Sequence, residues 1–373
     1  MRILQVANVR WFNATAWYAL SLADLVRQAG HESLVVTLAD TETDERAREL
    51  SLPVANLNLN TNNPLALAST AADMVRLLKK FQPDVVNCHR GEAFFLWALL
   101  RRLGFPYRLA RTRGDQRLPK SDFVNRWMHD AVADAVVATN RRMAEHFRNH
   151  MRISPEKLWI IRGGVDAERF AFDPAGRQRV REEFGFTDEH VVVGVAGRFD
   201  TVKGQKEVIQ AVARLRHDLE MTKVRLLLAG FESALSESQV RRWLAEHRLE
   251  DAAAVTGLRS DVAACYSAMD LAVVGSLWSE AIARAPLELM AAGRPIVSTD
   301  VGVLPDLLDP EALVPAGDVP ALTLKLVEAI KYEDLRQRML ARQKLTLSQH
   351  TREEFLRRSL SLYQGLLESP AAL

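Results

Sequence analysis

The chain has 373 residues and a mass of 41.8 kDa, a length that suits two domains of about 150–200 residues each. With 48% apolar and 26% charged residues, its composition is that of a soluble globular protein, and no run approaches the ~20 apolar residues of a membrane-spanning helix. The first seven residues indicate a short strand rather than a signal peptide. Two cysteines, Cys88 and Cys265, lack metal-ligand spacing and suit a reducing cytosol as inert core thiols.

The net charge of +2 hides an asymmetry between the two halves. Residues 1–165 carry 23 Lys and Arg against 16 Asp and Glu, whereas the remainder carries 26 against 31. Between Arg76 and Arg126 alone, 12 basic side chains accompany 4 acidic ones. This pattern predicts a negatively charged partner for the first half, either an anionic membrane surface or a phosphorylated glycolipid. A merely solvated basic face is the alternative, and no motif supports nucleic-acid binding.

Short β-branched runs alternate with helical patterns, which predicts βαβ units and parallel sheets. In the first half, Ala14–Gln28 is a helix stopped by Gly30, Ser69–Lys80 is a second helix, and residues 40–64 are mostly connection. The predicted strands of this half are Arg2–Ala7, Ser33–Leu38, Val54–Leu57, Val85–Cys88, Arg108–Arg111, Ala135–Thr139 and Trp159–Arg162.

A polar linker at residues 172–177 indicates a domain boundary near residues 168–190. The second half has predicted helices at Arg177–Phe184 and Lys206–Leu215, and its last segment, Thr351–Leu367, has the pattern of an amphipathic helix. The predicted strands of this half are Val191–Ala196, Val224–Ala229, Ala253–Thr256, Leu271–Val274 and Ile296–Ser298.

Two glutamates, Glu280 and Glu288, form the most informative feature of the chain. Glu280 follows a predicted strand, and Glu288 lies about one turn into a helix that ends at Gly293. Ligands of open α/β sheets bind at the carboxyl ends of strands, and helix N-termini favour phosphate. The pair therefore suits a sugar nucleotide, which has hydroxyls at both ends and a diphosphate between them. Two solvated carboxylates are the alternative, which this strand–loop–helix context disfavours.

Two cations, Arg198 and Lys203, follow the predicted strand Val191–Ala196. Fixed cations at this place would stabilise the negative charge that develops on a departing nucleoside diphosphate. Arginine grips phosphate through a planar fork, and lysine acts as a compact charge. Two such cations make a divalent metal unnecessary, and the chain has no Asp-x-Asp motif of the metal-dependent kind. Simple solvation at the surface is the alternative.

These motifs resemble those of the retaining GT-B glycosyltransferases of family 4, and the similarity extends through most of the chain. The segment of Glu280 and Glu288 resembles the E-x7-E signature, and Gly197-Arg198 with Lys203 resembles the G-R-x…K-G donor site. The resemblance implies that Glu280 faces the donor sugar, that Glu288 bonds the ribose hydroxyls, and that the two cations hold the diphosphate.

Two further donor-side segments follow from the same resemblance. The segment Gly257–Val262, which contains Arg259, matches the G-x-x-x-D-V turn that borders the nucleotide base in relatives. Ile282, Ala283 and Arg284 occupy the loop after Glu280, where the family pattern has glycines (E-G-F-G). Main-chain donors survive that change, but the added side chains restrict close backbone approach to the diphosphate.

On the acceptor side, the resemblance points to four residues. Asn13 lies in the loop after the first strand, where relatives carry a Gly-Gly turn, and His89 lies in a segment similar to the H-x-H region. Arg113 stands where many relatives have a histidine that touches the donor sugar. Because arginine cannot accept a proton at neutral pH, we expect Arg113 to bind phosphate or acceptor. Asp115 is a candidate contact to sugar or acceptor, and His89 is as readily a structural histidine.

The resemblance implies an α/β protein of GT-B fold, with two Rossmann-like domains that face each other across a cleft. Residues 1–170 with the C-terminal helix 353–373 form the expected acceptor domain, and residues 171–352 form the donor domain. The implied reaction moves a sugar from a nucleoside diphosphate to a hydroxyl of a glycan or glycolipid, such as lipopolysaccharide core. The expected enzyme needs no cofactor or metal, binds no nucleic acid, and is cytoplasmic and peripheral to the inner membrane face.

Functions of other classes stay open at this point. A nucleotide-sugar epimerase of GT-B fold would bind the same donor. A non-catalytic sugar-nucleotide-binding partner would fit the glycine-poor loops at residues 8–15 and 280–284. A nicotinamide dehydrogenase shares the Rossmann architecture, but neither half shows G-x-G-x-x-G after its first strand.

Overall fold

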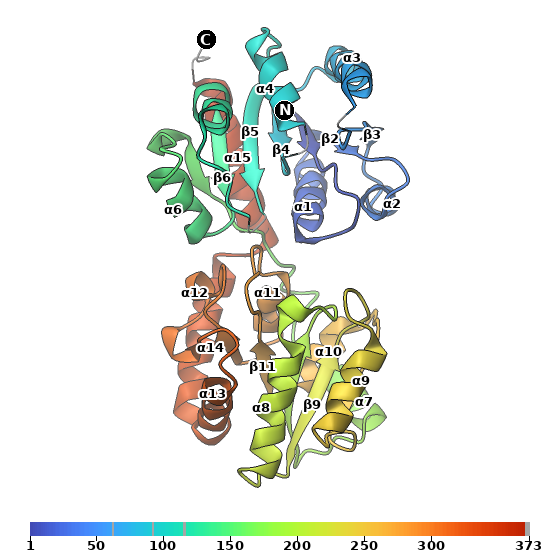
Figure 1. The fold of residues 1–373 in the computed structure, drawn as a ribbon, viewed down its shortest axis with the longest axis vertical. Coiled ribbons are helices and arrows are strands. Elements are labelled where there is room, and N and C mark those ends of the chain that lie inside the picture. The colour runs from blue at the N-terminus through green and yellow to red at the C-terminus, as the bar shows by residue number, and fades with distance from the viewer. Residues whose placement is uncertain (62, 92, 115–116, 370–373) are drawn as a thin grey trace. The chain divides into compact units, whose positions relative to one another are not determined.

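The computed structural model describes residues 1–61, 63–91, 93–114 and 117–369, which divide into two units. Unit 1 holds residues 1–163 together with the C-terminal helix α15 (Arg352–Glu368), and unit 2 holds residues 164–351 (Figure 1). The chain changes unit a few residues before the expected boundary at 170/171. Val165 already belongs to unit 2, because its N–H donates to the carbonyl of His350 at 2.9 Å.

Strand β1 (Arg2–Val6) lies within a parallel sheet of unit 1 that has the strand order β3-β2-β1-β4-β5-β6-β7. In register, Leu4 of β1 lies opposite Leu34 of β2 and Val86 of β4. Helices cover both faces of such a sheet, so its strands consist of buried apolar runs. The other described strands of this sheet are β2 (Glu32–Thr37), β3 (Val54–Asn56), β4 (Val85–Cys88), β5 (Arg108–Arg113), β6 (Ala135–Ala138) and β7 (Leu158–Ile160).

The first helix, α1 (Ala14–Gln28), has the predicted bounds because Asn13 caps its N-terminus and Gly30 follows its end. The segment 40–64, predicted to be mostly connection around one strand, contains the unpredicted helix α2 (Glu42–Glu49) as well as strand β3, which was predicted at Val54–Leu57. The second helix of this half, predicted at Ser69–Lys80, begins at Pro64. The remaining helices of unit 1 before α15 are α3 (Pro64–Phe81), α4 (Phe94–Arg102), α5 (Phe123–Arg126), the π-helix η1 (Trp127–Val132), α6 (Arg141–Asn149) and the 3₁₀ turn η2 (Pro155–Lys157).

The C-terminal helix α15 returns to unit 1, as the resemblance to the GT-B fold predicts. Its Phe355 ring meets the edge of Tyr18 on α1, with 4.6 Å between the ring centroids. Its Tyr363 hydroxyl accepts a hydrogen bond from Asn87 Nδ2 of β4 at 2.8 Å and one from Gln5 Nε2 of β1 at 3.4 Å. These contacts attach the last helix to the strands and to the first helix of the unit.

Unit 2 is built on strand β8 (Val191–Ala196) and a parallel sheet with the order β10-β9-β8-β11-β12-β13. The other strands are β9 (Val224–Ala229), β10 (Ala253–Val255), β11 (Leu271–Val274), β12 (Ile296–Thr299) and β13 (Leu313–Val314). The helices and helical turns are α7 (Pro174–Glu183), η3 (Thr201–Lys203), α8 (Gln205–His217), α9 (Glu237–Glu246), α10 (Val262–Ala268), α11 (Arg284–Ala291), α12 (Leu304–Leu307), η4 (Pro310–Ala312), α13 (Val319–Lys331) and α14 (Glu333–Ser348). Among the described residues, no helix combines the length and the apolar character needed to span a bilayer.

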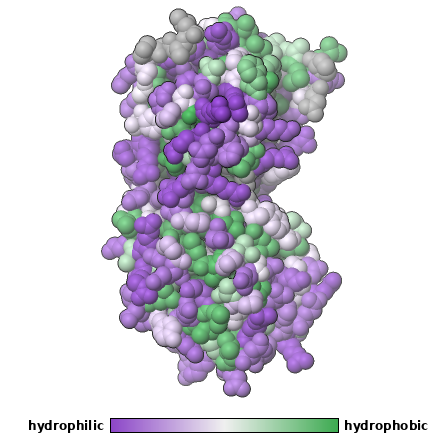
Figure 2. Space-filling view, turned by 60° about the vertical axis from the view of Figure 1, so that its left-hand side comes forward, coloured by the Kyte–Doolittle hydropathy of each residue, from purple (hydrophilic) through white to green (hydrophobic). Residues whose placement is uncertain are grey.

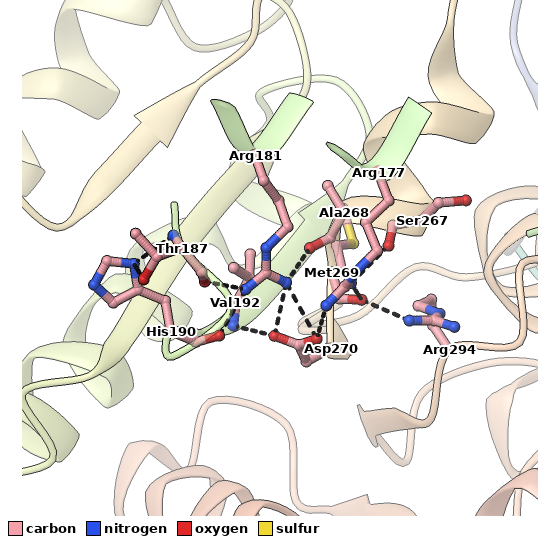
Figure 3. A network of polar contacts seen from close by, with 10 residues as sticks. All are labelled: Arg177, Arg181, Thr187, His190, Val192, Ser267, Ala268, Met269, Asp270 and Arg294. Atoms are coloured by element: carbon pink, nitrogen blue, oxygen red, sulfur yellow. Dashed lines mark hydrogen bonds and ion pairs between the residues drawn. The ribbon is translucent and has the colours of Figure 1, made fainter. Parts of the chain in front are cut away.

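A charged network ties the first helix of unit 2 to the amino end of strand β11 (Figure 3). Asp270, directly before β11, accepts from Arg177 Nη2 at 2.6 Å and from Arg181 Nη1 at 3.1 Å, both from α7. The same carboxylate accepts from the Val192 N–H of β8 at 2.8 Å. The network therefore holds α7 and two neighbouring strands together, at the end of the sheet opposite the loops described next.

Candidate functional site

Lys203 and Glu280 form an ion pair at the carboxyl edge of the unit 2 sheet. Lys203 Nζ lies 2.7 Å from Glu280 Oε2, and Ser276 Oγ donates to the same oxygen at 2.8 Å. Glu280 is 7% exposed and Ser276 is fully buried, so the carboxylate is held by a cation and a hydroxyl away from bulk water. The structure thus joins two residues that the sequence places 77 positions apart. Ser276 was not among the predicted site residues.

Close backbone contacts hold together the loops that carry Lys203 and Glu280. Gly204, which follows Lys203, has φ +67°, and a Cβ at this position would lie 1.9 Å from the Gly275 carbonyl oxygen. Gly302, after β12, has φ +64°, and a Cβ there would lie 2.1 Å from the carbonyl oxygen of Glu280. Only glycine permits both the left-handed backbone and these approaches. The loops after β8, β11 and β12 therefore pack as one support for Glu280.

Arg198 lies in the same β8–α8 segment as Lys203. It follows Gly197 at the end of β8, and its side chain is 42% exposed. Its Nη2 donates to Asp200 Oδ2 at 2.9 Å, and its carbonyl accepts from Gln205 Nε2 at 2.9 Å. The guanidinium is thus oriented by a neighbouring carboxylate while much of it stays accessible to a ligand.

Glu288 lies in helix α11 and is 5% exposed. Its Oε2 accepts from the Tyr266 hydroxyl of α10 at 2.8 Å, and its Oε1 accepts from Arg284 Nε at 2.9 Å. Arg284 was a predicted donor-side residue, whereas Tyr266 was not predicted. A tyrosine in the helix after the G-x-x-x-D-V turn carries no charge or motif signal that would have marked it.

The loop before α11 lacks the glycines of the E-G-F-G pattern, and one of its residues has a strained backbone. Ile282 and Ala283 are buried, and Ala283 has φ +52°, in the left-handed region that glycine adopts without penalty. Ala283 occupies the N-cap position of α11 and makes no side-chain capping bond there. The chain therefore has a left-handed alanine at a position where the family pattern has a glycine.

We expect Ala283→Gly to raise the free energy of unfolding by up to about 1 kcal/mol, because glycine removes the left-handed strain. The change can be measured by chemical denaturation. The matched control is Ala285→Gly on the same helix, where glycine weakens a helical position and should lower stability by several tenths to about 1 kcal/mol. Equal destabilisation by both variants would contradict the proposed strain.

Arg259, predicted to lie on the donor side, is engaged by two carboxylates. It contacts Glu183 Oε1 at the end of α7 at 2.7 Å, and it forms a two-pronged pair with Asp261 at 2.8 and 2.9 Å. These bonds raise the pKa of Arg259 and lower that of Asp261. The side chain thus ties the turn to α7.

The predicted acceptor-side residues of unit 1 have internal partners. Asn13 Oδ1 accepts from the Ala16 N–H at 3.0 Å as the cap of α1. His89 is fully buried and its Nε2 lies 2.7 Å from Gln5 Oε1. Burial, with the charge of Arg111 as a smaller cause, lowers the pKa of His89 to about 3, so the ring is neutral. Asn13 and His89 thus have structural roles in this arrangement.

Arg113 ends strand β5, and its Nη2 donates to the Arg117 carbonyl at 2.6 Å. Asp115 lies outside the described residues.

The two cysteines are buried, and burial raises the pKa of Cys88 to about 12 and that of Cys265 to about 11. Both thiols are therefore protonated and inert at neutral pH.

Comparison with known proteins identifies similar families and folds. Residues 176–345 match the family described as Glycosyl transferases group 1, and residues 15–169 match the family described as Glycosyltransferase Family 4. D-inositol 3-phosphate glycosyltransferase of Stackebrandtia nassauensis is 30% identical over 243 residues, which cover 59% of this chain and 54% of that protein. The chain spans about half the length of the curated relatives it matches.

Solved structures show the same architecture over nearly the whole chain. A glycosyltransferase from Rickettsia africae has a TM-score of 0.86 at 17% identity, with 99% of each chain covered. HepE of Anabaena in complex with UDP has a TM-score of 0.84 at 19% identity, with 98% of this chain and 100% of that chain covered. At these identities the similarity concerns the fold.

Proposed function

The chain belongs to the group 1 and family 4 glycosyltransferases, and from this membership we propose that it transfers a sugar from a nucleoside diphosphate to a hydroxyl acceptor, with retention of anomeric configuration. The observation that carries the proposal is the 2.7 Å pair of Lys203 Nζ and Glu280 Oε2 at the carboxyl edge of the unit 2 sheet. Ligands of α/β sheets bind at this edge. A cation for the diphosphate and a carboxylate for the sugar hydroxyls meet there.

In this proposal Lys203 and Arg198 bind the diphosphate. The ammonium of Lys203 has three donors and uses one on Glu280, so it can also hold a phosphate oxygen. Arg198 presents a half-exposed planar fork in the same segment. Their positive charge stabilises the diphosphate as it departs, which is the work that a divalent metal performs in other enzymes. The proposed reaction therefore needs no metal.

Glu280 and Glu288 bind the two hydroxyl-bearing ends of the donor. Glu280, fixed by Lys203 and Ser276, accepts from the sugar hydroxyls, and Glu288 accepts from the ribose hydroxyls. Because Glu280 already neutralises Lys203, we assign it binding of the sugar rather than attack on the anomeric carbon. The bond from that carbon to the phosphate oxygen breaks, the bond to the acceptor oxygen forms on the same face, and the acceptor proton passes to the departing phosphate oxygen.

A panel of UDP-, GDP- and ADP-sugars with glycan and glycolipid acceptors tests this function. Acceptor-dependent release of nucleoside diphosphate, with an unchanged anomeric configuration of the product by NMR, is the expected result. Isomerised sugar nucleotide without acceptor would instead indicate an epimerase. Binding with no turnover under acceptor-rich conditions would indicate a non-catalytic partner.

For the acceptor we propose a glycolipid or polysaccharide precursor, such as lipopolysaccharide core, presented at an anionic membrane on its cytoplasmic face. Helix α4 of unit 1 and its C-cap Leu103 support a surface contact, because Phe95, Leu99 and Leu103 recur every four residues and are 48%, 37% and 68% exposed. Figure 2 shows hydrophobic side chains that reach the surface among hydrophilic ones. The excess of basic residues between Arg76 and Arg126 suits anionic lipid.

We expect the double variant Phe95→Ser with Leu103→Ser to bind anionic vesicles roughly tenfold more weakly, since two apolar side chains are lost from the contact. Sedimentation with vesicles of phosphatidylcholine and phosphatidylglycerol measures the change. The control is Leu324→Ser, a 63% exposed leucine of unit 2. Equal binding of the wild type to vesicles of phosphatidylcholine alone would argue against an anionic surface as the partner.

A further inference from the structure

The two oxygens of Glu288 have partners of different character. Oε2 accepts from the hydroxyl of Tyr266, which is 4% exposed, at 2.8 Å. Oε1 accepts from Nε of Arg284, whose side chain is 46% exposed, at 2.9 Å. One oxygen is therefore held from inside the protein, and the other has a partner that reaches solvent.

This difference defines which side of the carboxylate a ligand can reach. An ionised carboxylate offers about four lone-pair positions, and two of them are used here. Arg284 reaches solvent and leaves other lone pairs of the carboxylate open, so in this arrangement Oε1 can accept from an incoming hydroxyl beside Arg284. Oε2, by contrast, is held by the buried Tyr266.

We infer that Tyr266 is a positioning residue for the donor: its hydroxyl fixes the Glu288 carboxylate so that Oε1 faces the ribose hydroxyls. This inference rests on the proposed function, in which Glu288 binds the ribose. Tyr266 is only 4% exposed, and in this inference it acts through Glu288. Its contribution is to keep Glu288 in one rotamer before the ligand arrives, so that little side-chain freedom is lost on binding.

The surroundings of Tyr266 suit such a role. Its ring lies in the core of unit 2 beside Phe170, with 6.1 Å between the ring centroids, and belongs to helix α10. Burial and the charge of Glu288 raise the pKa of Tyr266 well above its usual value. The phenol therefore stays protonated and remains a hydrogen-bond donor throughout the pH range of an assay.

Tyr266→Phe tests the inference, because it keeps the ring and removes only the hydroxyl. Isothermal titration calorimetry would compare UDP, GDP and ADP with their 2′-deoxy and 3′-deoxy forms. We expect the wild type to prefer a ribonucleotide over at least one deoxy form. The variant should bind that ribonucleotide about tenfold more weakly and the less favoured deoxy form equally well, so the preference shrinks.

Glu288→Gln should reduce the same preference, and adding it to Tyr266→Phe should cause little further loss, since both changes act on one contact. Tyr332→Phe, at a 60% exposed tyrosine of unit 2, serves as the control and should leave the preference unchanged. Equal weakening of ribo and deoxy forms by Tyr266→Phe would show a merely structural role and overturn the inference, as would no weakening. If the wild type binds none of the three diphosphates, the proposed function fails with it.

Discussion

Lys203→Ala should lower turnover by roughly 10²-fold or more, the order of loss seen when one charge-stabilising group is removed from a reacting centre. Lys203 lies 2.7 Å from Glu280, so its removal takes a cation from the proposed diphosphate site and also frees a buried carboxylate. Initial rates with the preferred sugar nucleotide and acceptor measure the effect. Lys203→Arg keeps the charge and should lose less.

Lys206→Ala is the matched control for Lys203, because this exposed lysine belongs to the adjoining helix α8 and its Nζ lies over the Trp243 ring at 5.9 Å from the centroid. It should retain close to wild-type turnover. Circular dichroism of both variants separates lost chemistry from lost folding. Wild-type turnover in a folded Lys203→Ala protein would remove Lys203 from the diphosphate site.

The strands and the GT-B class of this chain could be predicted because buried β-branched runs leave a strong local pattern. The bounds of β8, β9 and β11 agree with the expected ones, and the solved structures of similar fold confirm the class. Helix α2 could not be predicted in this way. It is highly charged, and it depends on the Thr41 cap and on the 3.0 Å pair of Arg48 with Asp44 instead of hydrophobic periodicity.

The approach of Lys203 to Glu280 follows from topology, since both loops leave the carboxyl ends of adjacent strands, β8 and β11. The supporting hydroxyls of Ser276 and Tyr266 were missed, because neutral buried residues give no motif. The sequence also did not indicate the internal partners of Arg259. Its side chain is bound by Glu183 and Asp261 of its own unit, and its place on the donor side stays a prediction.

The pairing in the structure changes how the proposed site works. In the sequence, Lys203 and Glu280 are separate candidates for separate parts of the donor. In the structure they share one contact, so a change at either residue alters the position of the other. Glu288 is likewise bound by Arg284, so both acidic groups of the proposed site are paired with a cation. A diphosphate that binds as proposed would therefore approach two ion pairs and not two bare carboxylates.

The second large effect is expected far from these loops, at Asp270. Asp270→Ala should lower the free energy of unfolding of unit 2 by about 3 kcal/mol, because it leaves Arg181 buried without its carboxylate. Arg181 is 3% exposed, and Arg177 also loses its 2.6 Å partner (Figure 3). The Asp270 side chain is 31% exposed, which places the effect at the lower end of the range for buried pairs.

Urea denaturation of the full chain measures this loss as a fall of roughly 1.5 M in the midpoint of the unit 2 transition. Asp188→Ala, at an exposed aspartate of the turn before β8, is the control and should shift the midpoint little. Asp270→Asn keeps an oxygen for the Val192 N–H and should fall between the two. A midpoint for Asp270→Ala equal to that of the control would mean that α7 is held by its apolar contacts alone. Val180 of α7, fully buried in the core of unit 2, would then carry the attachment that we assign to the charged network.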